Sequence, residues 1–471
     1  MPEITLKSMR CLSMFRNCAA ILAVCGALCA APSRTPQEQL AQSIFEELVD
    51  INTADSAANV TGAAEAMANR LRTAGFSDAD IHLEGDDPRF KNLVVRYRGA
   101  GTKPPILLLA HLDVVEARQS DWSLDPFHFV EKDGYFYGRG TIDDKSQAAC
   151  WIANLILFKQ EGFRPERDII VALTSGEESG EHNGVDWLLA NHRDWIDAGL
   201  ALNEGGDGSI RDGKKIANYV QASEKTYYSI ELKVTNPGGH SSMPRSDNAI
   251  YQLANALVRI SSYTFPIKLN EVTRTYFERT GKITPSPLGP AMLAIAKDPS
   301  DANALAVLAA DPRANAMLHT TCVPTLLSGG HAENALPQTA TAVVNCRVFP
   351  DDQPADVLRK LQEVVADASV AMRPVKPPRT SPTSPLTPEL MDTVESLTEQ
   401  LWPGVPVIPT MSTGATDSRA LRAAGIPSYG ISGFFLDEND NREHGRNERL
   451  AVDSFFGGRQ FLYELVKRLS R

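Results

Sequence analysis

The sequence predicts an α/β protein whose mainly parallel sheet is interrupted by an inserted α+β domain. Two continuous apolar runs, at 105–110 and 168–173, are typical of strands buried on both faces of a parallel sheet. Segments with helical spacing alternate with these strands, as helix-covered parallel sheets require. Near Tyr219 the pattern changes, and residues 228–235 alternate between apolar and polar like a half-exposed antiparallel strand.

The first part of the chain begins with two predicted helices, at 37–50 and 57–74, because apolar residues recur there at helical spacing. Gly75 ends the second helix. The alternating elements that follow are a strand at 92–97, the strand at 105–110, a helix at 145–160, the strand at 168–173, a helix at 183–191 and a strand at 199–202.

Within the insert, the same criteria predict helices at 248–260 and 354–366 and strands at 228–235, 321–327 and 339–348. A proline-rich stretch at 376–388 is typical of a linker. The β/α pattern then resumes with helices at 389–401, 418–424 and 454–469 and a strand at 427–431. The chain therefore divides into a first part at 32–221, an insert at 222–380 and a last part at 381–471.

Composition is that of an ordinary globular protein: 471 residues, 43% hydrophobic and 22% charged. The formal net charge of −11 argues against a nucleic-acid partner, because phosphate neutralisation needs clustered lysine and arginine. We expect no such partner.

Residues 1–31 have the features of a signal peptide. Basic residues precede an apolar run at 19–31 that ends in the small residues Ala30 and Ala31. The run is short for a membrane span. A lipid anchor at Cys25 or Cys29 is less well supported, because Val24 and Leu28 stand where small residues are expected. The expected location is therefore periplasmic or secreted, without a membrane span.

Three cysteines follow the leader: Cys150, Cys322 and Cys346. Their odd number and their spacing support neither a disulfide framework nor a metal site. We expect them to be small core residues. The alternative is a bond between Cys322 and Cys346, if adjacent strands bring the two together.

Polar residues with metal-binding chemistry follow three of the predicted strands. His111, with Asp113 nearby, follows 105–110; Glu177 and Glu178 follow 168–173; and Glu204 follows 199–202. In an α/β sheet the carboxyl ends of the strands carry the chemistry. Taken singly, each of these motifs could be an ordinary solvated loop.

Two adjacent carboxylates, Asp143 and Asp144, stand just before the helix at 145–160. Adjacent carboxylates repel unless a cation lies beside them, so one of them could bridge two metals; the alternative is a helix N-cap. His444 lies far along the chain in the sequence HGRNE. Together these side chains form a nitrogen and oxygen set suited to zinc, with one imidazole for each ion.

The ordered motifs resemble those of the co-catalytic dinuclear-zinc exopeptidase family, which includes aminoacylase, glutamate carboxypeptidase, desuccinylase and carnosine dipeptidase. The resemblance covers nearly the whole mature chain and rests on HLD, YGRGTIDDK, TSGEESG, NEGG, NPGGHSSMP, ENALP, TGATDSR and HGRNE. Length, leader and the extended segment 263–316 are most similar to the Gly-X carboxypeptidase branch. That branch also contains secreted N-acyl amino acid amidases.

The resemblance implies a metal site with two zinc ions per subunit, for which cobalt or manganese could substitute. The implied ligands are His111 and Glu204 for one ion, His444 and Glu178 for the other, and Asp143 as the bridge. It also implies a cis peptide bond between Asp143 and Asp144, with Asp144 outside the ligand set.

The resemblance further implies roles beside the metals. Asp113 would hold the ring of His111, and Glu177 would be the general base. His240, in the insert, would reach the active site of a partner subunit and donate a hydrogen bond to the oxyanion. The insert would thus be a lid and dimerisation domain, and the protein a homodimer.

Four positions match residues that hold substrate in relatives: Asn334, Arg347, Gly414 and Thr416. Arg347 could bind a carboxylate with two parallel hydrogen bonds, or could form a surface salt bridge instead.

The function implied is a zinc-dependent, carboxypeptidase-like hydrolase that cleaves an amide bond adjacent to a free carboxylate. The alternatives are an N-acyl amino acid deacylase and a dipeptidase, so the expected substrate is a peptide or an N-acyl amino acid. A glutamate at position 204 goes with carboxypeptidases and deacylases in this family. A serine hydrolase is disfavoured because the chain lacks a G-x-S-x-G elbow.

Overall fold

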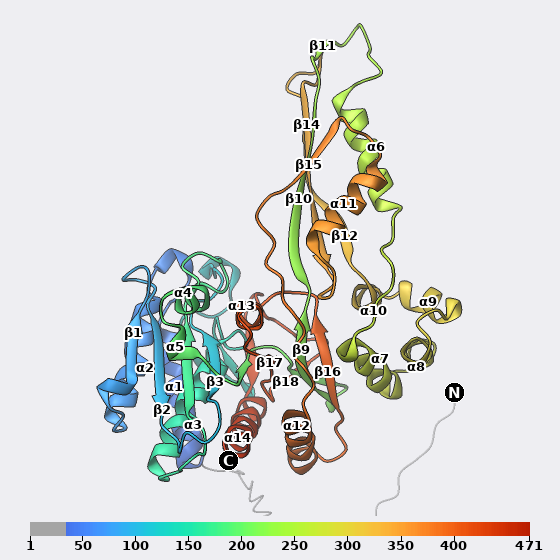
Figure 1. The fold of residues 1–471 in the computed structure, drawn as a ribbon. Coiled ribbons are helices and arrows are strands. Elements are labelled where there is room, and N and C mark those ends of the chain that lie inside the picture. Colours follow the sequence, from blue (N-terminus) through green and yellow to red (C-terminus); the bar gives the residue numbers. More distant parts are fainter. Residues whose placement is uncertain (1–33) are drawn as a thin grey trace, which may run out of the picture. The chain divides into compact units, whose positions relative to one another are not determined.

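The computed structural model describes residues 34–471 (Figure 1). Its largest sheet confirms the predicted α/β fold. The strand order is β1 (Ile81–Glu84), β2 (Asn92–Tyr97), β6 (Ile169–Thr174), β3 (Ile106–His111), β7 (Leu200–Asn203), β17 (Ser428–Gly430), β9 (Lys214–Glu224), β8 (Gly208–Arg211) and β18 (Phe435–Asp437), and β16 (Val407–Ser412) pairs with β9. The central strands β6, β3, β7 and β17 are parallel, so their carboxyl ends lie along one edge.

Both faces of this sheet are covered by helices, which explains why β3 and β6 are apolar at nearly every position. One face packs against α1 (Pro36–Asp50), α2 (Val60–Thr73), α3 (Lys145–Gln160), α12 (Pro388–Leu401) and α14 (Val452–Leu469). The other packs against α4 (Gly184–Asn191), α5 (Arg193–Ile196) and α13 (Ser418–Ala423). Alternate residues of β3 enter the two cores, as the pleat of a strand requires.

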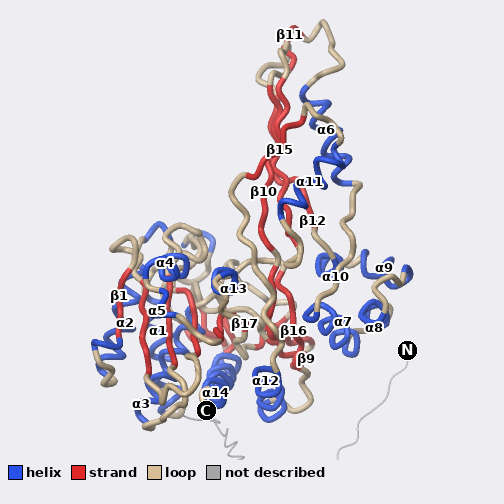
Figure 2. The backbone as a smooth tube through the Cα atoms, viewed as in Figure 1, coloured by secondary structure: helices blue, strands red, loops and turns tan. Residues whose placement is uncertain are grey.

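A separate four-stranded antiparallel sheet lies within the predicted insert (Figure 2). Its order is β12 (Thr321–Gly329), β14 (Thr339–Val348), β10 (Thr226–Thr235) and β15 (Val370–Pro374). Helices α6 (Ala249–Ser261) and α11 (Pro354–Val365) cover one face, and alternate residues of β10 and β14 are buried beneath them. We call this sheet with its two helices the lid. The strands β11 (Gly239–His240) and β13 (Ala335–Leu336) pair at the ends of β10 and β14 that lie away from β9.

Four further helices within the insert share a core with the central sheet. They are α7 (Glu271–Ile283), α8 (Leu288–Lys297), α9 (Ala302–Ala309) and α10 (Pro312–Leu318), and their buried residues pack with Ala217 of β9 and with Ile408 and Met411 of β16. The extended segment 263–316 therefore contributes to the wall beside β9 and β16. The sequence alone did not place these helices.

A three-stranded sheet of β19 (Arg449–Ala451), β5 (Tyr135–Tyr137) and β4 (Val130–Lys132) joins the region before α3 to the region before α14. This pairing brings the DD and HGRNE motifs, about three hundred residues apart, next to each other. The predicted cis peptide bond between Asp143 and Asp144 is present.

The expectation that Cys322 and Cys346 are unpaired core residues was wrong. They are directly opposite on β12 and β14, with their Cα atoms 4.0 Å apart, and form a disulfide bond. Of the cysteines in the described part of the chain, Cys150 alone is free, and it is buried. The register of the two strands decides this pairing, and cysteine spacing does not reveal it.

The predicted signal peptide at 1–31 lies outside the described residues. Across residues 34–471, none of the helices combines the length and the apolar character that crossing a membrane requires.

Removing the disulfide should destabilise the lid. The bond closes a loop with a sequence separation of 24, for which the chain-entropy relation gives about 3.5 kcal/mol. We expect Cys346→Ala to unfold at lower denaturant concentration than the wild type under oxidising conditions. Reduction of the wild type should reproduce the shift, whereas an unchanged midpoint in both cases would contradict a stabilising role.

Candidate active site

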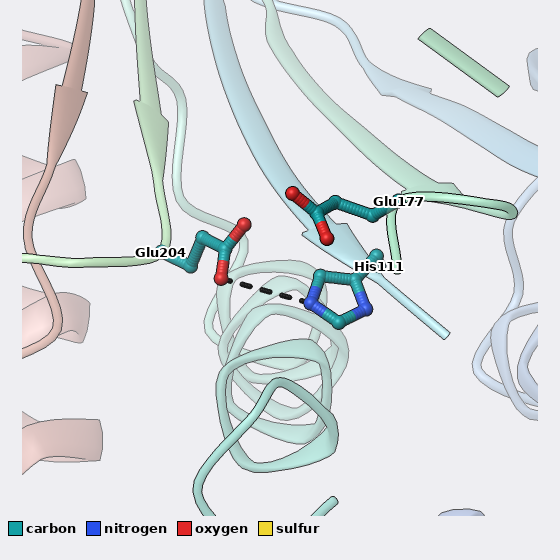
Figure 3. Close-up of side chains that lie close together, drawn as sticks. All are labelled: His111, Glu177 and Glu204. Carbon is teal, nitrogen blue, oxygen red and sulfur yellow. Dashed lines mark ion pairs between the residues drawn. The ribbon is translucent and has the colours of Figure 1, made fainter. Parts of the chain in front are cut away.

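The strand ends bring three of the predicted motifs together. His111 is the last residue of β3, Glu177 and Glu178 follow β6, and Glu204 follows β7. Because β6, β3 and β7 are adjacent and parallel, these residues meet at one edge of the sheet. Figure 3 shows the carboxylates of Glu177 and Glu204 close to the His111 ring, whose Nε2 lies 3.6 Å from Glu204 Oε2.

Asp143 lies between the two predicted imidazole ligands. Its Oδ1 is 2.7 Å from His111 Nε2, and its Oδ2 is 2.9 Å from His444 Nε2. His444 Nε2 is also 3.1 Å from Glu178 Oε1. The five residues predicted as ligands therefore form two clusters that share one carboxylate. In each of three overlapping groups, potential ligand atoms lie within 4.8 Å of one another: His111, Glu177 and Glu204; His111, Asp143 and Glu178; Asp143, Glu443 and His444.

The ring of His111 is held differently from the sequence expectation. Its Nδ1 lies 2.9 Å from the main-chain carbonyl of Asp113, whereas the Asp113 carboxylate is 3.8 Å from that nitrogen. Because a carbonyl only accepts, Nδ1 donates and Nε2 faces the cluster. The carboxylate instead accepts hydrogen bonds from the amides of Glu177 and Glu178, at 3.2 and 3.0 Å. Asp113 thus positions both His111 and the turn that carries the two glutamates.

The concentration of carboxylates makes this site electrostatically costly without a cation. Burial raises the pKa of Glu204 to about 8, although His111 acts in the opposite direction. Burial and the nearby Glu204 also raise the pKa values of Glu177 and Asp144 well above their ordinary values. Hydrogen bonds to Asp143 and Glu178 raise the pKa of His444 to about 10.

The donor set fits metal ions. Glu204 Oε1 is buried and makes no hydrogen bond to the described residues, and Asp144 Oδ2 is in the same situation. A buried carboxylate oxygen without a partner is expensive, and a cation would remove both the desolvation and the repulsion. Imidazole nitrogens and carboxylate oxygens are also the ligands that zinc and neighbouring divalent metals take.

A cavity of about 1380 Å³ opens over this cluster. Of the predicted substrate-binding residues, it is lined by Arg347, Gly414 and Thr416. The guanidinium of Arg347 lies 4.8 Å from the Tyr227 ring, and its Nη1 donates to the carbonyl of Thr413 at 3.3 Å. Arg347 thus connects β14 of the lid to the loop of the TGATDSR motif.

Two predicted residues lie elsewhere within the chain. His240 and Asn334 do not line the cavity. His240 lies on β11 and Asn334 directly precedes β13, with which β11 pairs, and the Ser241 amide donates to the Asn334 carbonyl. His240 is exposed and its Nδ1 lies 2.7 Å from Ser242 Oγ. One chain alone therefore does not bring His240 to the metal cluster.

Sequence reasoning missed two acidic residues of the site. Glu443 precedes His444, lines the cavity and belongs to one of the three ligand groups. Glu224 accepts from the amide and the hydroxyl of Thr416, at 3.0 and 3.1 Å, and so fixes the predicted substrate loop. The position of Glu443 beside a predicted ligand was an available signal, whereas nothing in the sequence pattern pointed to Glu224.

Residues 107–468 match the sequence profile of peptidase family M20/M25/M40. The chain belongs to this family, and it is a hydrolase of the metallopeptidase and amidohydrolase class.

Among its relatives, the chain is 30% identical over 380 residues to the N-fatty-acyl-amino acid synthase/hydrolase PM20D1 of Xenopus tropicalis, covering 77% of this chain and 72% of that protein. It is also 30% identical over 397 residues to the probable carboxypeptidase S-like 2 of Dictyostelium discoideum, covering 81% and 75%. Its fold matches the M20 family metallo-carboxypeptidase Sso-CP2 of Sulfolobus solfataricus with a TM-score of 0.67 at 15% identity, covering 91% and 99%.

Replacing the carboxylate that faces both imidazoles should weaken metal binding more than replacing a carboxylate that faces only one of them. We expect Asp143→Asn to lose most of its bound metal and Glu204→Gln to lose less, because Asp143 faces both imidazoles and Glu204 faces only His111. Elemental analysis after dialysis measures the difference. Equal metal content in the two variants would contradict the bridging position of Asp143.

Proposed function

We propose that this protein is a dinuclear zinc hydrolase that cleaves an amide bond adjacent to a free carboxylate, in the manner of a carboxypeptidase. The observation that carries the proposal is the position of Asp143, whose two oxygens face two different imidazoles. Such an arrangement suits two cations that share one carboxylate. His111 and Glu204 would hold one ion, and His444 and Glu178 the other. Cobalt or manganese could occupy the same ligands.

Zinc ions, when bound there, supply Lewis acidity that polarises a carbonyl oxygen and acidifies water. The protein's own general base is Glu177. Its carboxylate lies close to His111 and Glu204, and its backbone amide donates to the Asp113 carboxylate, which fixes the turn that carries it. Glu177 takes a proton from the attacking water and returns it to the leaving amine. Its enclosed setting favours proton uptake, because burial raises its pKa.

The free carboxylate of the substrate has a partner in Arg347. This guanidinium lines the cavity, and the structure gives it contacts with Thr413, Asn345 and the Tyr227 ring but, among the described residues, no ion pair with an acid. A guanidinium with unused donors suits two parallel hydrogen bonds to a carboxylate. The loop with Gly414 and Thr416 forms the adjacent wall.

A second candidate substrate is an N-acyl amino acid, for which the chemistry and the free carboxylate are the same. The similarity to a protein named as an N-fatty-acyl-amino acid synthase/hydrolase favours it. Apolar groups in the cavity wall, from Met317 of α10, Met411 of β16 and Tyr219 of β9, could contact an acyl chain.

We further propose that two copies of the chain form a homodimer through the lid, and that His240 acts on the partner's substrate. The outer strand β12 supports this, because it is the edge of its sheet and Val323, Leu326 and Leu327 on it are exposed. An exposed apolar edge strand is prone to pair with another chain. His240 would then donate to the oxyanion that forms during amide hydrolysis.

Export to the periplasm or medium is proposed on two grounds. The leader at 1–31 has the composition of a signal peptide. The Cys322–Cys346 disulfide suits an oxidising compartment.

Substrate class can be decided with zinc-reconstituted protein and paired substrates that share one amino acid. The substrates are a dipeptide and the N-acetyl and N-lauroyl derivatives of its C-terminal amino acid. Each should be hydrolysed only when its carboxylate is free, so the same compounds with the carboxylate converted to an amide serve as controls. Faster hydrolysis of the dipeptide supports the carboxypeptidase reading, and faster hydrolysis of an acyl derivative supports the second candidate. Equal turnover of the blocked forms would refute the requirement for a carboxylate.

Glu177→Ala should retain metal and fold but lose about 10²–10⁴-fold in kcat, the usual contribution of a general base. Its metal content and thermal unfolding are measured beside kcat, and Glu181→Ala in the same loop, on an exposed residue, is the control. If Glu177→Ala hydrolyses substrate at a rate near that of the wild type, another group is the base.

His240→Ala should lose about 10²–10³-fold in kcat, the cost of one oxyanion donor, with normal metal content. If His240 acts in the partner's site, co-refolding His240→Ala with Glu177→Ala should restore activity, because mixed dimers contain one intact site. An inactive mixture that contains mixed dimers would rule out action across the interface.

A further inference from the structure

A buried ion pair lies directly behind the metal cluster. Arg139 belongs to the YGRGTIDDK motif and Glu448 to the HGRNE motif, and neither is a predicted ligand. Their side chains are 3% and 0% exposed, and the guanidinium Nη1 donates to Glu448 Oε2. Burying two charges is costly unless further hydrogen bonds satisfy them, so the other partners of this pair matter.

Glu448 holds the turn that carries Asp143. Its Oε1 accepts from the amide of Ile142 at 2.7 Å and from the amide of Asp143 at 3.3 Å, and its Oε2 accepts from the amide of Gly140 at 3.2 Å. Three amides of this turn therefore donate to one carboxylate. This fixes the backbone from which Asp143 projects between His111 and His444.

Arg139 holds the loop that carries His444. Its Nη2 donates to the carbonyls of His444 and Gly445, at 3.3 and 3.2 Å. His444 has a φ of 58°, in the left-handed region that non-glycine residues seldom adopt. Such a conformation persists only where neighbouring groups stabilise it, and the hydrogen bonds from the Arg139 guanidinium contribute to that stabilisation.

The Trp122 ring packs over the guanidinium of Arg139. It lies 5.3 Å from the guanidinium of Arg139, whose Nη1 donates to the Glu448 carboxylate while Nη2 donates to the carbonyls of His444 and Gly445. A lysine could neutralise Glu448, but its single ammonium could not reproduce these divergent contacts.

We propose that Arg139 and Glu448 are positioning residues that set the separation of the two cations by tying the Asp143 turn to the His444 loop. The inference rests on the proposed dinuclear site. It assigns the pair no contact with substrate. Its consequence is that the ion held by His444 depends on Arg139, and that the shared position of Asp143 depends on Glu448.

The chain offers a matched control for this proposal. Arg422 and Glu224 form another buried arginine–glutamate pair, 1% and 0% exposed with an N–O distance of 2.6 Å. Glu224 also accepts from Thr416 of the predicted substrate loop, and the hydrogen bonds of Arg422 go to Ser381 and Ser428, so the pair serves as a control for metal affinity and stability and not for turnover. Arg139→Lys and Arg422→Lys therefore make the same chemical change in comparable burial. Any general loss of stability should appear in both, whereas a loss of metal binding should follow Arg139 alone.

The test is competition for zinc between the full-length protein and a chromophoric chelator, together with thermal unfolding. We expect Arg139→Lys to bind one of two ions about 10–100-fold more weakly, the usual effect of changing a group that orients a ligand. Arg422→Lys should bind both ions as the wild type does. Excess zinc should restore kcat of Arg139→Lys, which a merely structural defect would not permit.

A second variant, Glu448→Gln, retains an acceptor for the Ile142 amide but removes the charge; we expect it to weaken both ions. If it does not fold, the comparison of the two lysine variants decides. Wild-type affinity in Arg139→Lys, or equal loss in both lysine variants, would overturn the proposal. Absence of zinc binding in the wild type would instead refute the proposed function. This outcome is distinct from failure of the positioning proposal, which shows only in the variants.

Discussion

The repulsion among carboxylates at the end of β6, β3 and β7 is the constraint to which the rest of the structure responds. Glu177, Glu204 and Asp144 cannot all ionise cheaply in that enclosure, as their raised pKa values indicate. Fixed donors hold the cluster in place: the amides of Glu177 and Glu178 bind Asp113, and two imidazoles flank Asp143. A site that concentrates carboxylates in this way suits cations, which would relieve the repulsion.

The parallel order of the central strands turns distant sequence motifs into neighbours. Each ligand needs only to follow a strand, because the carboxyl ends share an edge. Asp143 and His444 are the exceptions among the predicted ligands, since Asp143 lies in the turn before α3 and His444 in the loop between β18 and β19. The place of His444 depends on the pairing of β19 with β5, which joins two motifs about three hundred residues apart. The site is thus built partly by the main sheet and partly by a small accessory one.

Much of this could be predicted from the sequence, and the exceptions have physical causes. Continuous apolar runs identified β3 and β6, and helical spacing placed α3 at its observed bounds. The helices α7–α10 were not placed, because short amphipathic segments do not reveal which core they join. The bond between Cys322 and Cys346 depends on strand register, and the hydrogen bond from His111 to a main-chain carbonyl depends on loop geometry. Neither is encoded in residue spacing.

The pairing of β10 with β14 runs without interruption from Thr226 opposite Val348 to Thr235 opposite Thr339, and it sets Arg347 across from Tyr227. Successive side chains of such a ladder face opposite ways, so one inserted or deleted residue in either strand would reverse the facing of everything beyond it. Length variation in homologues should therefore be rare within this ladder and gather at its far tip. Gly330 lies there, in a left-handed conformation with open space around it.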